Sequence, residues 1–151
     1  IPKTLIRWMI AAIADSEEFA PAKAVLEDIL DTPISPELLP PDESGKISQY
    51  TEDLVGPYAL HDFFLYYMLR FGFAPRKIFT LACRAFEGDF DRETVKKWLK
   101  AFYRRFFTQQ FKRSCLPDGV KVGSVCLSPR GDWRMPSDAV GRIWLQEVEQ
   151  L

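Results

Sequence analysis

The stretch DRETVKKWLKAFYRRFFTQQ, residues 91–110, predicts a long helix with one apolar face. Asp91 is a good N-cap, because its carboxylate can accept hydrogen bonds from free backbone N–H groups one turn further on. Most of the Lys and Arg side chains lie off the apolar stripe. The stripe consists of Val95, Trp98, Leu99, Phe102 and Phe106.

Five other stretches have apolar residues at helical spacing and predict further helices. They are residues 3–14, a segment that Pro21 opens, one from Pro57 to Gly72, one from Pro75 to Gly88, and one after Pro136. The segment from Pro57 is apolar nearly all round, so we expect it to be buried on most sides. Residues 32–50 read as an extended loop, and only residues 121–127 have the composition of a short strand. The chain is therefore expected to be mainly α.

Length and composition favour a single helical unit, residues 1–151, that is part of a longer protein. The chain starts at Ile1 and runs straight into a helical pattern, as expected of a piece cut from a longer protein. Three scattered cysteines, Cys83, Cys115 and Cys126, fit a reducing cytoplasm better than a disulfide framework. The chain has no apolar run long enough for a transmembrane span, so no membrane partner is expected.

Charge is unevenly distributed along the chain although the net charge is only −1. Residues 1–60 carry four Lys or Arg and eleven Asp or Glu, whereas residues 104–134 carry seven Lys or Arg and two Asp. This asymmetry predicts an anion site in the C-terminal part, the alternative being two solvated faces of opposite charge. Lys112 could supply a point charge to a phosphate, and Arg113 or Arg134 could fork onto one.

The segments 110–119 and 128–138 form a long irregular loop rich in Lys, Arg, Pro and Gly, and such loops are usually functional. Asp132 stands two residues before Arg134, so in an extended segment both side chains would face the same side. We expect Asp132 either to hold the guanidinium of Arg134 or to bind a hydroxyl group itself.

Several kinds of site are not favoured by the sequence. His61, the one histidine, has no identifiable proton-transfer partner, and a structural role is expected for it. The dispersed Cys residues lack the ligand spacing of a zinc site, so no metal site is predicted. Neither a P-loop nor a dinucleotide-binding glycine pattern is present, so any loop that cradles ATP phosphates lies outside this chain.

The C-terminal part closely resembles the end of the glutamine-dependent NAD(+) synthetase family. The resemblance is carried by FFTQQFKRS (106–114), LPDG (116–119) and SPRGDWRMPSD (128–138). The stretches TEDLVGPY (51–58), LHDFFLY (60–66) and PISPEL (33–38) look like the same family. Together these motifs extend the resemblance over essentially the whole chain.

The resemblance implies a fold and a reaction. The parent would be a ligase that forms NAD, AMP and pyrophosphate from deamido-NAD, ATP and ammonia, with Mg and an N-terminal glutaminase domain that releases the ammonia from glutamine. The chain would be the helical C-terminal portion of its Rossmann-like α/β ATP-pyrophosphatase-type synthetase domain. Neither the glutaminase nor the ATP loop is in this chain, which would bind no cofactor and be inactive alone. A homo-oligomer in the cytoplasm is expected.

The resemblance also assigns roles to individual residues. Lys112 matches an active-site lysine that contacts substrate, and is the catalytic candidate. Candidates for binding the dinucleotide are Asp132, Arg134, Ser137 and Lys3, and candidates near nucleotide phosphate are Ser35 and Arg113. Pro36 stands where the family has Ala, and Pro2 where it has Asn.

Two other classes of function stay open at this point. Aromatic side chains among cations at residues 102–107 could stack bases, as in a nucleic-acid-binding helical module. The acidic first 60 residues and the aromatic helix could instead serve as an interaction surface of a structural module.

Overall fold

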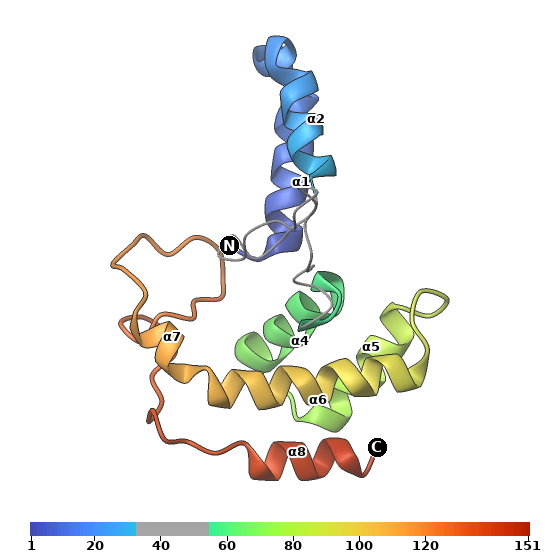
Figure 1. Ribbon diagram of the computed structural model, residues 1–151, viewed down its shortest axis with the longest axis vertical. Coiled ribbons are helices and arrows are strands. Elements are labelled where there is room, and N and C mark those ends of the chain that lie inside the picture. Colours follow the sequence, from blue (N-terminus) through green and yellow to red (C-terminus); the bar gives the residue numbers. More distant parts are fainter. Residues whose placement is uncertain (33–54) are drawn as a thin grey trace, which may run out of the picture. The chain divides into compact units, whose positions relative to one another are not determined.

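The computed structural model describes residues 1–32 and 55–151, which divide into two compact units, Ile1–Ala59 and Leu60–Leu151. Within these described ranges the chain forms helices and irregular segments and no strand (Figure 1). The expectation of a mainly α chain is confirmed. The strand predicted at residues 121–127 is wrong, because this segment lies in an irregular loop and has no neighbouring strand with which to pair. Most of the predicted 32–50 loop, with Ser35, lies outside the described residues.

The N-terminal unit is a pair of helices joined by a short turn. Helix α1 (Lys3–Ala14) is followed by the 3₁₀ helix η1 (Glu17–Ala22) and by α2 (Lys23–Asp31), and α1 and α2 lie side by side (Figure 1). The first helix was predicted, while Pro21 falls inside η1 rather than opening α2. The Lys23 ammonium binds the Asp15 carboxylate at 2.8 Å and ties the start of α2 to the end of α1.

The C-terminal unit contains the hydrophobic core. Its helices are α4 (Tyr58–Phe71), α5 (Pro75–Ala85), α6 (Arg92–Thr108), α7 (Gln110–Ser114) and α8 (Arg142–Glu149). Four of the five residues of the predicted α6 stripe are buried, with Val95 and Leu99 fully inaccessible and Phe102 2% exposed. Trp98 is the exception and is only partly buried. The Asp91 carboxylate accepts a hydrogen bond from Thr94 N at 2.6 Å, so the predicted cap is confirmed.

Helix α4 is less buried than its composition predicts. Leu60, Phe64 and Met68 form one buried stripe, whereas Tyr66 and Phe71 remain 41% and 51% exposed. The Phe64 ring contacts the Phe102 ring of α6, with centroids 5.8 Å apart. The outer rings of α4 pack on one another instead, as Tyr66 and Phe71 do at 5.6 Å. Aromatic residues around the whole helix therefore do not mean burial around the whole helix.

Polar contacts join helix α8 to both α5 and α6. The Glu147 carboxylate accepts a hydrogen bond from Arg76 N at 2.9 Å and so caps the start of α5. From α6, Lys96 donates to the carbonyl oxygen of Leu151 at 2.7 Å, just beyond the end of α8. A cation at a helix C-terminus and a carboxylate at an N-terminus both complement the helix dipole. The helix predicted after Pro136 begins only at Arg142, because residues 137–138 form a turn and residues 139–141 are irregular.

Tyr103 is completely buried in this core, and its hydroxyl makes no hydrogen bond with another described residue. Burial raises the pKa of the phenol, and Glu147 raises it further. The hydroxyl therefore stays protonated and neutral in the folded unit.

His61 packs its ring edge-on against Phe102, with centroids 5.4 Å apart. Burial lowers the pKa of the imidazole, Arg105 adds to this effect, and Asp62 opposes it. The ring is neutral at neutral pH and acts as part of the core.

This burial makes stability depend on pH. Because the folded-state pKa of His61 lies below its unfolded value, the stability it contributes is present above the unfolded pKa and is lost as the pH falls. We expect the melting temperature to drop between about pH 7.5 and about pH 5, and to drop less in His61→Gln. Thermal unfolding followed by circular dichroism tests this, and an identical pH dependence in both proteins would contradict it.

Candidate functional site

The catalytic candidate Lys112 stands on α7, a single turn that follows α6 after a break at Gln109. Its side chain is exposed and makes no hydrogen bond or ion pair with any residue that the structure describes. A cation in water with no acid beside it is available to an anionic ligand. The predicted availability of Lys112 agrees with this geometry, while its catalytic role stays a prediction.

Arg113, the next residue, turns into the protein. Its guanidinium lies over the Phe106 ring, 4.1 Å from the centroid, and its Nη2 donates to Phe106 O at 2.6 Å. The same nitrogen donates to Gln110 Oε1, and Met135 Sδ lies 3.5 Å away. Burial lowers the pKa of Arg113, with no carboxylate beside it in the described chain. The two adjacent cations thus have different environments.

The irregular segment after α7 is held by its own polar contacts. Arg130 donates to Leu116 O at 2.6 Å and pairs with the Asp118 carboxylate at 2.9 Å. Backbone bonds from Gly131 N and Trp133 N to Ser128 O, at 3.0 and 3.4 Å, close a turn in the second half of the segment. The loop is therefore shaped by contacts between its two halves and not by a sheet.

The predicted pair between Asp132 and Arg134 does not form. Asp132 instead binds the Lys121 ammonium, from the first half of the loop, and Arg134 Nε donates to Pro129 O at 3.1 Å. The reason is the turn at Ser128, which brings other partners closer to each side chain than they are to each other. Arg134 remains exposed, and its terminal nitrogens bind no other described residue.

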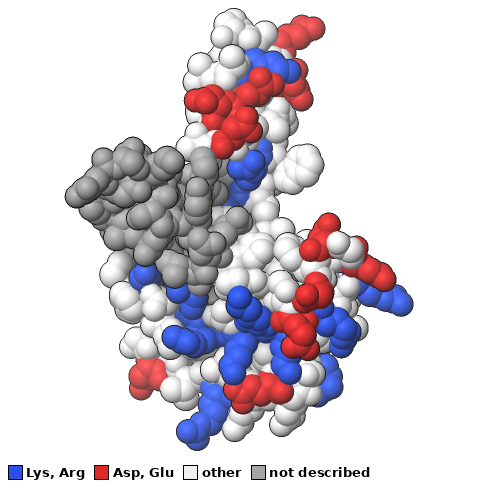
Figure 2. Space-filling model, turned by 45° about the vertical axis from the view of Figure 1, so that its right-hand side comes forward, with Lys and Arg blue, Asp and Glu red and all other residues white. Residues whose placement is uncertain are grey.

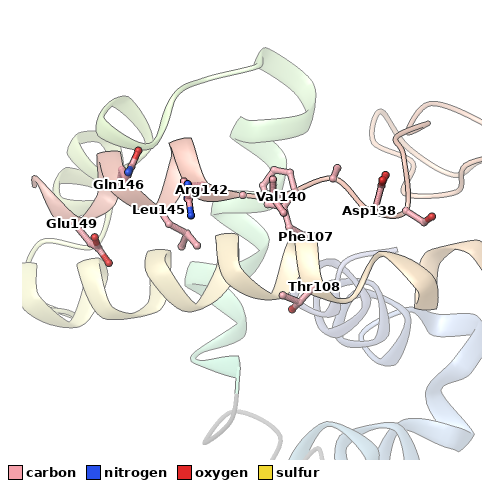
Figure 3. Close-up of a pocket in the computed structure, with 11 residues that line it drawn as sticks. Phe107, Thr108, Asp138, Val140, Arg142, Leu145, Gln146 and Glu149 are labelled. Carbon is pink, nitrogen blue, oxygen red and sulfur yellow. The ribbon is translucent and has the colours of Figure 1, made fainter.

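Ser137 lines an open pocket of about 850 Å³ between the end of α6 and the start of α8 (Figure 3). Phe107 and Thr108 come from α6, Asp138 and Val140 from the loop, and the rest of the labelled wall from α8. Sequence reasoning missed that wall, because the last helix was placed too early. The spacing of Arg142, Leu145, Gln146 and Glu149 at one helical face is the signal that could have found it.

Gly141 is required at the back of this pocket. A Cβ atom there would lie 2.5 Å from Cδ2 of Phe107, whose ring is held against Trp144 with centroids 4.8 Å apart. We expect Gly141→Ala to destabilise the unit by about 1–3 kcal/mol through overpacking. Chemical denaturation checks this. Ser137→Ala, on the exposed side of the pocket, is the control and should change stability far less.

The other predicted site residues are not brought to this place by the described structure. Lys3 is exposed on α1 in the N-terminal unit, which the structure does not place against the loop. Ser35 lies outside the described residues.

Figure 2 shows Lys and Arg side chains gathered over the C-terminal unit, with acidic groups among them. Of the cations at residues 104–134, Lys121 and Arg130 are paired with carboxylates and Arg113 is turned inward. The basic character predicted from sequence is thus partly neutralised inside the loop. Of the cations that follow α6, Lys112 and Arg134 remain exposed without an ion pair to a described residue, while Arg104 and Arg105 lie on α6 itself.

No group of three or more His, Cys, Asp or Glu side chains within residues 1–32 and 55–151 is arranged to hold a metal ion. None of the helices in these ranges is long and apolar enough to cross a membrane.

Comparison with known proteins supplies the family. No family model matches the chain. The glutamine-dependent NAD(+) synthetase of Mycobacterium leprae is 43% identical over 172 residues, which covers 99% of this chain. Those of Mycobacterium bovis and Mycobacterium tuberculosis are 41% identical over 169 residues, again with 99% coverage of this chain. The chain spans about a quarter of the length of each of these relatives. By this similarity the chain belongs, as one segment, to the glutamine-dependent NAD(+) synthetase family.

Proposed function

We propose that this chain is the C-terminal part of the synthetase domain of an enzyme that makes NAD from deamido-NAD, ATP and ammonia. The observation that carries the proposal is the 41–43% identity to proteins of that name along 99% of the chain. The Rossmann-like part with the ATP loop, and the glutaminase domain that supplies ammonia, would lie elsewhere in the complete protein. The chain alone would bind substrate groups without turning them over.

The side chains of Lys112 and Arg134 are suited to an anionic dinucleotide. Lys112 offers three donors on a flexible stem, and Arg134 offers its terminal nitrogens while Pro129 O holds its Nε. We propose that both contact deamido-NAD, with Ser137 as a further polar contact at the edge of the α6–α8 pocket. Asp132 is also proposed to contact the dinucleotide, and for that it must share its carboxylate with Lys121.

The reaction has two steps that need charge stabilisation and positioning. The nicotinate carboxylate attacks the α-phosphorus of ATP and displaces pyrophosphate, which gives an acyl-adenylate. Ammonia then attacks the acyl carbon, AMP leaves, and a proton is released to form the carboxamide. A cation such as Lys112, aimed at oxygens on which negative charge grows, lowers the barrier. In the second step, holding ammonia in line with the acyl carbon of the adenylate supplies much of the reduction in the activation barrier. This step therefore needs no catalytic His.

Mg²⁺ accompanies ATP in the family resemblance, and such an ion is usually held by one or two carboxylates together with the phosphates of the nucleotide. The described ranges contain no group of three or more His, Cys, Asp or Glu side chains that could hold it without the nucleotide. Ser35 near nucleotide phosphate and Lys3 on the dinucleotide are proposed contacts that rest on the resemblance alone, as do the homo-oligomer and the cytoplasmic location. The resemblance also assigns Arg113 to nucleotide phosphate, whereas its guanidinium is turned inward onto Phe106 and Gln110.

The nucleic-acid-binding alternative has no observation in its favour. Its aromatic residues, Phe102, Tyr103, Phe106 and Phe107, are all less than 10% exposed. Rings in the core cannot stack on bases.

An assay of the complete protein tests the proposal. With deamido-NAD, ATP and ammonia we expect NAD, AMP and pyrophosphate to appear in equal amounts, because each turnover makes one of each. Liquid chromatography with mass spectrometry measures the three products. Omitting deamido-NAD is the control. Absence of NAD formation by the folded protein, or formation of ADP in place of AMP, would overturn the proposed reaction.

A further inference from the structure

The last turn of α6 and the short helix α7 together present one contact surface to the loop that follows them. Gln110 is 3% exposed, and its amide accepts from Arg113 through Oε1 and donates to Met135 O, 3.5 Å away, through Nε2. Arg113 covers the Phe106 ring and donates to the Phe106 carbonyl oxygen. Three side chains, Phe106, Gln110 and Arg113, therefore form one polar and aromatic platform.

Two loop residues are seated on this platform. Trp133 meets the Phe106 ring edge-on at 5.4 Å, and its Nε1 lies 3.0 Å from Met135 Sδ. The sulfur of Met135 lies in turn 3.5 Å from Nη2 of Arg113. Aromatic edge contacts and sulfur contacts of this kind each contribute to holding a segment in place. The loop is thus attached to α6 and α7 at residues 133 and 135.

Arg134 lies between these two attached residues. Trp133 and Met135 are partly buried and Arg134 is exposed, which is the alternation of an extended segment. Fixing the backbone on both sides fixes the direction in which Arg134 leaves the loop. The helix turn that presents Lys112 to solvent is the one that holds Arg113 inward.

We propose that Arg113 is a positioning residue, which clamps the loop through Met135 and Trp133 and so fixes the direction in which Arg134 leaves the loop, and that it does not bind nucleotide phosphate. This proposal rests on the proposed function, since it deepens the description of the same dinucleotide site. The guanidinium would have to give up the Phe106 ring, two oxygen acceptors and the sulfur contact to reach a phosphate. Leaving these acceptors unpaired in a buried place is costly.

Hydrogen exchange of the complete protein without any ligand gives the first test. In Arg113→Met, which keeps the length of the side chain and loses its donors, we expect backbone amides of residues 130–137 to exchange about tenfold faster, as follows from losing a buried hydrogen bond to a charged group. Arg84→Met, at an exposed position on α5, is the matched control and should leave this segment unchanged. A residue that only binds phosphate would also leave it unchanged, and that result would overturn the proposal.

Kinetics of NAD formation give the second test. A positioning role predicts that Arg113→Met raises KM for deamido-NAD about tenfold and that Trp133→Phe adds little to it, because both changes release the same clamp. Independent, multiplying effects of the two substitutions, or a rise confined to the KM for ATP, would overturn the proposal. If Arg113→Met does not fold, Met135→Leu keeps the volume, removes the sulfur contact and is measured by the same exchange. The exchange result stands without substrate, so its failure is distinguishable from failure of the proposed reaction.

Discussion

Replacing Lys112 by Ala is expected to reduce NAD formation from deamido-NAD, ATP and ammonia by about 100- to 1000-fold, the range found when one preorganised charge-stabilising group is removed. The physical reason is that Lys112 is exposed, unpaired within the described chain and carried on a helix turn that the Arg113 contacts hold in place. Steady-state rates at saturating substrate measure the loss. Release of ammonia from glutamine should continue, because Lys112 would have no part in it.

Lys97→Ala is the matched control for this experiment. Lys97 is also an exposed lysine of the same unit, and its ammonium lies over the Trp98 ring, 4.5 Å from the centroid, on the α6 helix. Its removal changes the net charge by the same amount and should leave synthesis of NAD intact. If the Lys112→Ala enzyme were as active as the wild type, Lys112 would have no catalytic role. If Lys112→Ala and Lys97→Ala lost the same activity, the effect would come from the change in net charge and not from the position of Lys112.

Phe102→Ala is expected to destabilise the C-terminal unit by about 3–5 kcal/mol, as large-to-small changes of core aromatics do. Its ring contacts rings from two helices, His61 and Phe64 on α4 and Phe106 on α6, with centroids 5.4, 5.8 and 5.9 Å away. Removing the ring would leave a cavity and abolish these ring contacts between α6 and α4. Native-state hydrogen exchange of amides in α6 measures the free energy of unfolding of this unit.

The same substitution at an exposed position separates core packing from loss of an aromatic residue in general. Phe111 is 59% exposed on α7, and Phe111→Ala should change the same free energy by less than about 1 kcal/mol. If the two substitutions had similar effects, the core described around Phe102 would be wrong.

Local sequence patterns were sufficient for the helices that carry a cap or a stop signal. Asp91 begins α6 because its carboxylate binds Thr94 N, and Gly72, with φ of 65°, follows α4 at a backbone conformation that other residues rarely adopt. Sequence patterns failed where contacts between distant residues determine the local structure. The segment at 121–127 has strand-like composition and no strand partner among the described residues. Helix α8 begins only at Arg142, directly after Gly141, which packs closely against Phe107.

The sequence and the family resemblance named Lys112, Asp132, Arg134 and Ser137 as site residues, and that assignment stays a prediction. The structure places Lys112 on α7 and the other three in the irregular segment after it. Sequence spacing could not show that Lys121 takes Asp132, because that pairing depends on how the loop turns at Ser128. Nor could it tell Lys112 from Arg113, since adjacent cations look equivalent in a sequence while helical geometry sends their side chains in different directions.

The carboxylate of Glu147 caps the start of α5 across a separation of 71 residues. During translation, α5 therefore leaves the ribosome long before the group that completes its first turn has been synthesised. Contacts between residues so distant in sequence form slowly. The apolar side of the nascent α5–α6 pair therefore stays exposed to solvent until α8 has been synthesised. Chaperone binding to the growing chain should accordingly persist until α8 emerges, and a stop codon placed before Arg142 should yield an aggregating product.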